Sequence, residues 1–130
     1  MILAIEAASP TTKLWLEKDP KATHPTVVWD SGRTLADGLL GQIDNLLKQS
    51  QMQLSDLTGI VVFSGPGSFT SLRVGHSVAN ALADSLKIPV VGQQGDGWLA
   101  DGLARLAGGS NDQIVLPFYG AEANISKPKA

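Results

Sequence analysis

The feature that most constrains the fold is a buried-strand pattern followed at once by a glycine-rich turn and a helix. Residues 59–63 read Gly-Ile-Val-Val-Phe, a continuous apolar run typical of a strand that is covered on both faces. The turn Gly-Pro-Gly follows at 65–67, and apolar residues then return at helical spacing over 68–86. We therefore predict an α/β domain with residues 59–63 at the centre of its sheet.

The remaining periodicities complete this plan. Three short antiparallel strands open the chain, and helices then alternate with parallel strands. The predicted elements are strands at 2–7, 13–17 and 26–29, a helix at 34–50, the strand at 59–63, a helix at 68–86, a strand at 89–91 and a helix at 98–106. This order predicts one ribonuclease-H-like lobe with a mixed five-stranded sheet over residues 1–119. We also expect a short last strand at 114–116 and a loosely held tail at 120–130.

Composition excludes several classes of protein. A chain of 130 residues with a net charge of −2 has the size of one domain and no excess of cations for binding RNA by itself. It has no cysteine, which excludes disulfides and thiolate metal sites and suits the cytoplasm. We expect no membrane span, because no apolar run approaches the ~20 residues that a bilayer requires. Residues 2–7 read as a strand, not a signal peptide.

Few residues suggest catalysis. His24 and His76 are the only histidines, and we expect His76 on a helix surface. Neither Ser64 nor Ser68 has the flanking glycines of a nucleophile elbow. Glu6 ends the first strand, where a carboxylate could hold Mg²⁺ or activate water, but a single acid does not make a site. We expect no catalytic residue, metal or cofactor.

The Gly-Pro-Gly loop is the most informative candidate site. Its members are Gly65, Pro66, Gly67, Ser68, Phe69 and Thr70. Glycines there permit positive φ, and the free amides at a helix start could hold an anion or contact a partner. Arg73, one turn into the helix, could clamp a phosphate or carboxylate. The alternative is a tight turn in which Ser68 or Thr70 caps the helix.

A row of small residues follows the loop. Ser71, Gly75, Ala79 and Ala83 recur every fourth residue, so another backbone could approach this side of the helix closely. Gly38 and Gly41 lie in the preceding helix and add to this candidate partner interface. Two interpretations remain open: docking of a second protein, or packing of these two helices on each other.

The same segments carry a resemblance to a known family. They are residues 2–6, 39–47, 54–60, the run Gly-Pro-Gly-Ser-Phe-Thr-Ser-Leu-Arg-Val-Gly at 65–75, and Ile-Pro-Val-Val-Gly at 88–92. Together they resemble the bacterial tRNA threonylcarbamoyladenosine biosynthesis proteins TsaB, also called YeaZ, over roughly residues 1–107. The chain departs from the family pattern at Glu6, Ser71 and Leu35, where Asp, Gly and His are common.

The resemblance implies an actin-like ATPase superfamily fold, here a minimal version that lacks most of the second lobe. It also implies a non-catalytic scaffold that pairs with the transferase TsaD and the ATPase TsaE, with tRNA contacted only through the complex. Two other functions stay open: a stand-alone nucleotide hydrolase or peptidase, and a homodimer formed through the same helices.

Overall fold

The pattern around residues 59–63 produces a strand followed by a helix. The structure is a computed structural model that describes residues 1–8, 10–17 and 25–117. Strand β4 (Gly59–Phe63) is buried at every position and leads through the Gly-Pro-Gly loop into helix α2 (Phe69–Leu86). The predicted strand and helix are therefore both confirmed, with Ser68 just before the first helical residue.

The other elements lie close to their predicted positions. They are β1 (Ile2–Glu6), β2 (Thr11–Glu17), β3 (Val27–Asp30), α1 (Leu35–Gln49), β5 (Val90–Gln93) and α3 (Trp98–Ala107), with short 3-10 turns at Gly32–Thr34 and Leu54–Asp56. The predicted tail at 120–130 lies outside the described residues. Of the helices in the described part of the chain, none is long and apolar enough to cross a membrane.

The five strands form one mixed sheet in the order β3-β2-β1-β4-β5. β1 pairs antiparallel with β2 and parallel with β4, so Leu3 has Leu16 on one side and Ile60 on the other. β3 extends the antiparallel half, and β5 runs parallel to β4. This arrangement confirms the predicted α/β class and its mixed five-stranded sheet. The predicted central position of residues 59–63 is wrong, because β1 is the middle strand and β4 lies between β1 and β5.

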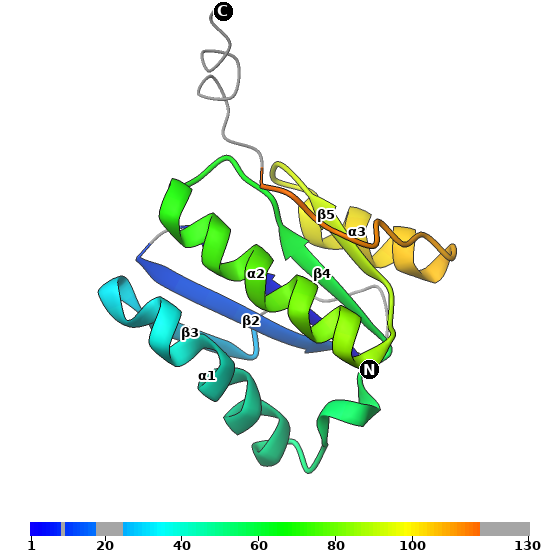
Figure 1. Cartoon of the computed structure of the whole chain (residues 1–130), viewed down its shortest axis with the longest axis horizontal. Helices are drawn as coiled ribbons and strands as arrows, with labels where there is room; N and C mark the ends of the chain where they lie inside the picture. The colour runs from blue at the N-terminus through cyan, green and yellow to red at the C-terminus, as the bar shows by residue number, and fades with distance from the viewer. Residues whose placement is uncertain (9, 18–24, 118–130) are drawn as a thin grey trace, which may run out of the picture.

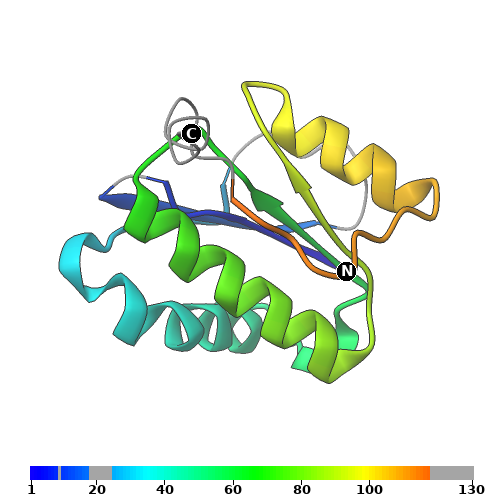
Figure 2. The same cartoon turned by 45° about the horizontal axis from the view of Figure 1, so that its top comes forward.

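Helices cover both faces of the sheet, which makes three layers. α1 and α2 lie on one face and α3 on the other (Figure 1, Figure 2). Because side chains alternate along a strand, neighbouring residues of β4 enter different cores. Val62 packs with the α1 and α2 layer, whereas Val61 packs under α3.

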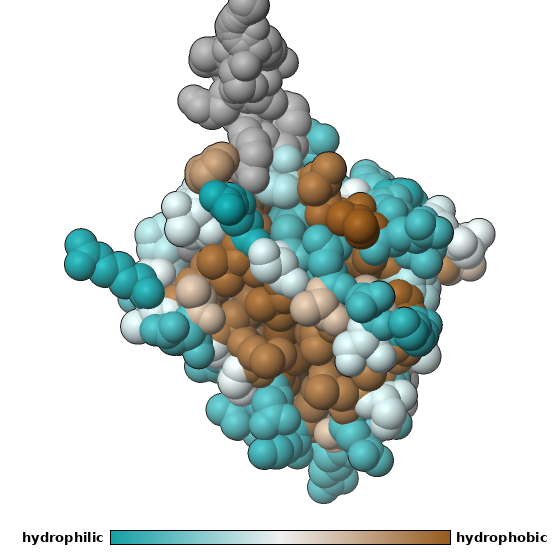
Figure 3. Space-filling view, viewed as in Figure 1, coloured by the Kyte–Doolittle hydropathy of each residue, from teal (hydrophilic) through white to brown (hydrophobic). Residues whose placement is uncertain are grey.

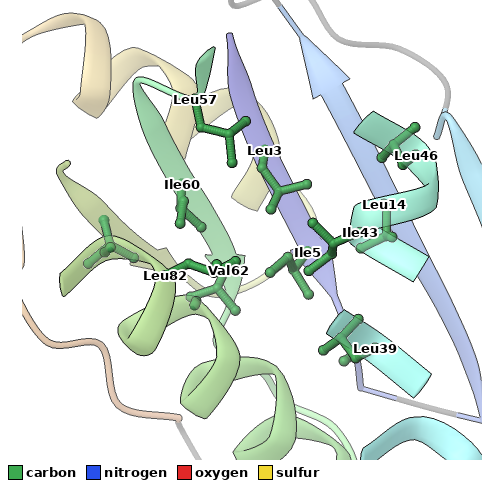
Figure 4. Packing of buried hydrophobic residues seen from close by; sticks show 14 of the residues in the cluster. Leu3, Ile5, Leu14, Leu39, Ile43, Leu46, Leu57, Ile60, Val62 and Leu82 are labelled. Carbon is green, nitrogen blue, oxygen red and sulfur yellow. The ribbon is translucent and has the colours of Figure 1, made fainter. Parts of the chain in front are cut away.

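The larger core lies between the sheet and the helix pair. Figure 4 shows Leu3 and Ile5 of β1 directed toward Leu39 and Ile43 of α1. Leu82 brings α2 into the same cluster. The smaller core under α3 is aromatic: the rings of Trp15 and Trp98 meet edge to face with centroids 5.3 Å apart.

The predicted last strand at 114–116 is wrong. This segment runs beside β5, but the Asn80 side chain on α2 forms hydrogen bonds with both backbone groups of Val115. Its amide nitrogen donates to the Val115 carbonyl at 3.1 Å, and its carbonyl oxygen accepts from the Val115 N–H at 2.8 Å. A side chain thus provides the hydrogen bonds that a neighbouring strand would otherwise supply.

Candidate functional site

The Gly-Pro-Gly loop is held between the ends of two strands. The Ser68 N–H donates to the carbonyl of Ala8 at 2.8 Å, and the Gly95 N–H donates to the carbonyl of Gly65 at 3.1 Å. Gly65 has a φ of 115°, so the expected positive φ occurs there, before a cis peptide bond to Pro66. Gly67 is not in the positive-φ region. It is glycine because a Cβ at 67 would lie 2.5 Å from the Cβ of Ala8.

The loop ends as a helix cap. The Oγ of Ser68 accepts from the Ser71 N–H at 3.4 Å, which confirms Ser68 as the capping residue in place of Thr70. Phe69 is exposed, and the guanidinium of Arg73 lies 5.4 Å from the centre of its ring. Both side chains therefore stand at the surface beside the loop. Binding of an anion or partner at the loop stays a prediction.

The expected docking role of the small-residue row is wrong, because most of the row faces the sheet. Ala79 is fully buried, Gly75 and Ala83 are buried, and Ser71 is partly covered. A Cβ on Gly75 would lie 3.2 Å from the Cβ of Ala7 on the sheet side. The small side chains let α2 approach β1 and β4 closely, so they serve packing within this chain.

The two glycines of α1 differ in their surroundings. A Cβ on Gly38 would lie 2.7 Å from the ring of Trp29, so this position packs internally against β3 and is not open to a partner. Gly41 has nothing within 4 Å of its Cβ direction and is exposed. Of the residues predicted for the interface, Gly41 is the one that stands open.

An apolar groove lies beside Gly41, between α1 and α2. One pocket of about 440 Å³ is lined by Leu40, Gly41, Ile43, Asp44, Leu54 and Leu82. A second, of about 390 Å³, is lined by Ala36, Thr70, Arg73, Val74, Ser77 and Val78. Hydrophobic colour gathers between α1 and α2 on this face of the molecule (Figure 3). We call these two pockets together the α1–α2 groove.

Sequence reasoning missed most of this groove. Leu40 is 54% exposed and Leu54 is 37% exposed, although both are large and apolar. The available signal was the pair Leu39-Leu40, because only one of two adjacent residues on a helix can face the core. Leu39 is fully buried, which leaves Leu40 for the outside.

His76 is not on the helix surface as expected. It is buried, and its Nε2 lies 3.0 Å from the Oγ of Ser64 while its Nδ1 lies 2.7 Å from the carbonyl oxygen of Leu72. Burial lowers the pKa of His76, and the hydrogen bond to Leu72 opposes this shift only in part. Nothing in the sequence pattern joins residues 64 and 76, because their contact depends on how α2 lies on the sheet.

Acidic residues do not gather around Glu6. Glu6 stands opposite Lys13 in the pairing of β1 with β2. Across residues 1–8, 10–17 and 25–117, no group of three or more His, Asp or Glu side chains is placed to hold a metal ion. A ligand role for Glu6 therefore has no support from its neighbours.

Comparison with known proteins identifies relatives of two named kinds. A family model described as tRNA N6-adenosine threonylcarbamoyltransferase, TsaD, matches residues 27–94. The transferase of that name from Syntrophotalea carbinolica is 48% identical over 50 residues, which are 38% of this chain and 15% of the relative. The tRNA threonylcarbamoyladenosine biosynthesis protein TsaB from Haemophilus influenzae is 30% identical over 90 residues, which are 69% of this chain and 37% of the relative.

The structural comparison agrees with these relatives. YeaZ from Pseudomonas aeruginosa superposes with a TM-score of 0.61 and 29% identity, over 72% of this chain and 43% of YeaZ. This likeness confirms the expected actin-like, ribonuclease-H-like fold. The chain spans less than half the length of each of these relatives. Because the family model covers more than half of the chain, the chain belongs to the threonylcarbamoyltransferase family, and within it to the TsaB/YeaZ-like proteins.

Proposed function

We propose that this chain is a non-catalytic partner subunit in threonylcarbamoyladenosine modification of tRNA, and that it docks a TsaD-like transferase through the α1–α2 groove. The names of the TsaB relatives support the pathway. The observation that carries the docking surface is the exposed apolar groove itself. A TsaE-like ATPase is the further partner that the resemblance implies, and tRNA is contacted through the complex.

The groove has the composition of a protein interface. Leu40 and Leu54 expose apolar surface that folding of this chain leaves uncovered. Burying such surface contributes roughly 25 cal/mol per Å², which favours a partner that covers it. Gly41 lets a second backbone come close, as small residues do where helices cross.

Charges border the groove without filling it. Asp44 lines the pocket near Leu54 and pairs with Lys48 at 3.0 Å, and Arg73 lines the other pocket. An apolar centre with a charged rim is the usual arrangement of a protein interface. The groove therefore supports docking of a protein surface more than binding of a small anion.

The decisive experiment is Gly41→Arg. The open space at Gly41 accepts a side chain, so the variant keeps its fold while a long charged group enters the groove. Overpacking costs typically about 1–3 kcal/mol, so affinity for the transferase falls by about 5- to 150-fold in calorimetric titration. Ala100→Arg, on the exposed side of α3, is the matched control and binds like the wild type.

Equal binding by Gly41→Arg and Ala100→Arg would show that the transferase docks elsewhere. Sedimentation of the chain alone tests the homodimer: a dimer that Gly41→Arg dissociates would place self-association at the same groove. Hydrolysis of ATP or peptide by the chain alone, abolished by Glu6→Ala, would overturn the non-catalytic part of the proposal.

A further inference from the structure

Ser64 and His76 form a polar pair that the docking role does not use. Ser64 directly follows β4, and His76 lies in the second turn of α2, so the pair joins the end of β4 to the helix beside it. Their side chains are 3.0 Å apart. Ser64 is 4% exposed and His76 is 3% exposed, so water is largely kept away from both.

The hydrogen bond to Leu72 fixes the protonation of the imidazole ring. A carbonyl oxygen can only accept, so the Nδ1 of His76 carries the proton that is donated to Leu72. In the neutral ring, Nε2 is then an acceptor, and the hydroxyl of Ser64 must donate to it. Burial lowers the pKa of His76, which keeps the ring neutral near pH 7. A hydroxyl that donates to a ring oriented by a third group is the arrangement of an activated serine.

Ser64 also reaches a pocket. It lines a pocket of about 390 Å³ at the carboxyl ends of β4 and β5, together with Gly92, Gln93 and Asp112. A Cβ on Gly92 would lie 2.5 Å from the Oγ of Ser64, so the hydroxyl fits beside position 92 only because that residue is glycine. The charged groups at this end, Asp112 and Arg105, pair with each other.

The apolar residues that line the pocket indicate the class of substrate. Ile114 and Leu116 line it and are both exposed, which gives part of the pocket an apolar surface. The pocket lies at the small end of the range for ligand sites, so it suits a short acyl group. None of the described residues that line it is a cation that would select an anionic substrate.

We propose that Ser64 is a nucleophile toward small activated carboxylic esters, with His76 as its general base. The Oγ of Ser64 bonds to the ester carbonyl carbon, and its proton passes to the Nε2 of His76. The bond from that carbon to the leaving oxygen then breaks, and the proton leaves His76 to the departing group or to solvent. Nothing is oxidised or reduced. Water later hydrolyses the acyl-serine, which restores the hydroxyl.

The test uses p-nitrophenyl acetate with the full chain. We expect one acetyl group on Ser64 by peptide mass spectrometry, with a rapid first release of one equivalent of nitrophenol before the slower hydrolysis of the acyl-serine. Ser64→Ala abolishes this adduct. Ser85→Ala removes an exposed serine of α2 and leaves the rate unchanged. His76→Gln slows acetylation about 100-fold or more, the usual contribution of a general base.

Absence of an adduct on Ser64, or an equal rate in His76→Gln, would overturn the proposal in favour of a purely structural pair. Far-ultraviolet circular dichroism checks that the variants fold. Should His76→Gln fail to fold, the pH dependence of the wild-type acetylation rate decides. This rate must fall as His76 becomes protonated, at a pH below the ordinary histidine pKa of 6.5. The NMR signals of the imidazole ring report its protonation. A rate independent of that protonation overturns the proposal as well. The transferase-docking role is independent of either result, and an adduct on Ser64 would restrict the non-catalytic part of the proposed function to the tRNA modification itself.

Discussion

Gly67 is a residue of the Gly-Pro-Gly loop that has no room for a side chain. Its missing side chain leaves room for Ala8, whose carbonyl oxygen would lie 2.9 Å from a Cβ at position 67. We predict that Gly67→Ala lowers the free energy of unfolding by about 1–3 kcal/mol, because backbone and a short side chain must both shift. Urea unfolding measures this change.

Gly41→Ala is the matched control for Gly67→Ala. The added methyl group meets nothing within 4 Å, and alanine favours a helix over glycine by about 1 kcal/mol. Stability should therefore rise at position 41 and fall at position 67. Similar changes at the two glycines would mean that the contact with Ala8 does not constrain the loop.

His76 makes the stability of the fold depend on pH. Burial lowers its pKa below 6.5 in the folded protein, so the unfolded chain binds a proton at higher pH than the folded chain does. Stability is then full above about pH 6.5 and falls as the pH decreases below it. We predict a decreasing urea midpoint from about pH 7 to about pH 5.

His76→Gln isolates this dependence, since the variant should lose most of the decrease between those pH values. Asp112 does not contribute to this decrease in stability, because the hydrogen bond from Arg105 lowers its pKa below 3.8. It therefore becomes protonated only at a more acidic pH. A midpoint that falls equally in both proteins would assign the effect to other groups.

At the scale of elements, the outer edge of β5 is closed by side chains. The N–H of Gly92 donates to Asp112 at 2.9 Å, and the N–H of Val90 donates to the Oδ1 of Asn111 at 3.2 Å. Arg105 on α3 holds Asp112 in place with an ion pair at 2.5 Å. An edge strand with its backbone groups paired in this way cannot recruit another strand.

We predict that Asp112→Ala opens this edge locally. The amide of Gly92 loses its acceptor, so its hydrogen exchange becomes faster while the amides of β1 keep their protection. Asp84→Ala is the control, because its ion pair with Lys87 is exposed and 3.9 Å long. Unchanged exchange at Gly92 would show that Asp112 does not protect the edge.

The helices and strands were predictable because their apolar residues recur with distinct spacings over long segments. The alternation around Trp15 and the helical stripe through Leu39 and Ile43 each allow one secondary structure. The segment 114–116 was wrongly predicted as a strand because its three residues are apolar. No local pattern shows that the Asn80 side chain forms hydrogen bonds with the backbone of Val115. Hydrogen bonds between distant segments are invisible in local periodicity.

The candidate site was predictable only where local chemistry decides it. The cap at Ser68 follows from residue type and position. The orientation of α2 did not follow, because the helix has a row of small residues as well as large ones. Ala79 faces the sheet because the row of small residues lets α2 lie closer to the strands. Which side of α2 faces the sheet depends on the residues of β1 and β4. The Ser64–His76 contact depends on the same choice.

For the whole molecule, the position of Ala79 between the helix pair and the sheet has a measurable consequence. The side chain is fully buried in the larger core. We predict that Ala79→Arg unfolds the chain or costs more than about 3 kcal/mol, since it forces an unpaired charge into a packed layer. Thermal unfolding followed by circular dichroism measures this loss. Wild-type stability in this variant would contradict the layer arrangement.

The three tryptophans give each face of the sheet its own optical signal. Trp15 of β2 and Trp98 of α3 stack edge to face in one core, whereas Trp29 of β3 lies against α1 on the opposite side. Coupling between two indoles produces a paired circular dichroism band in the far-ultraviolet that an isolated indole lacks. Separation of α3 from the sheet would remove that band, and loosening of α1 would instead alter the fluorescence of Trp29. A single sample thus reports on both sides of the molecule without any attached label.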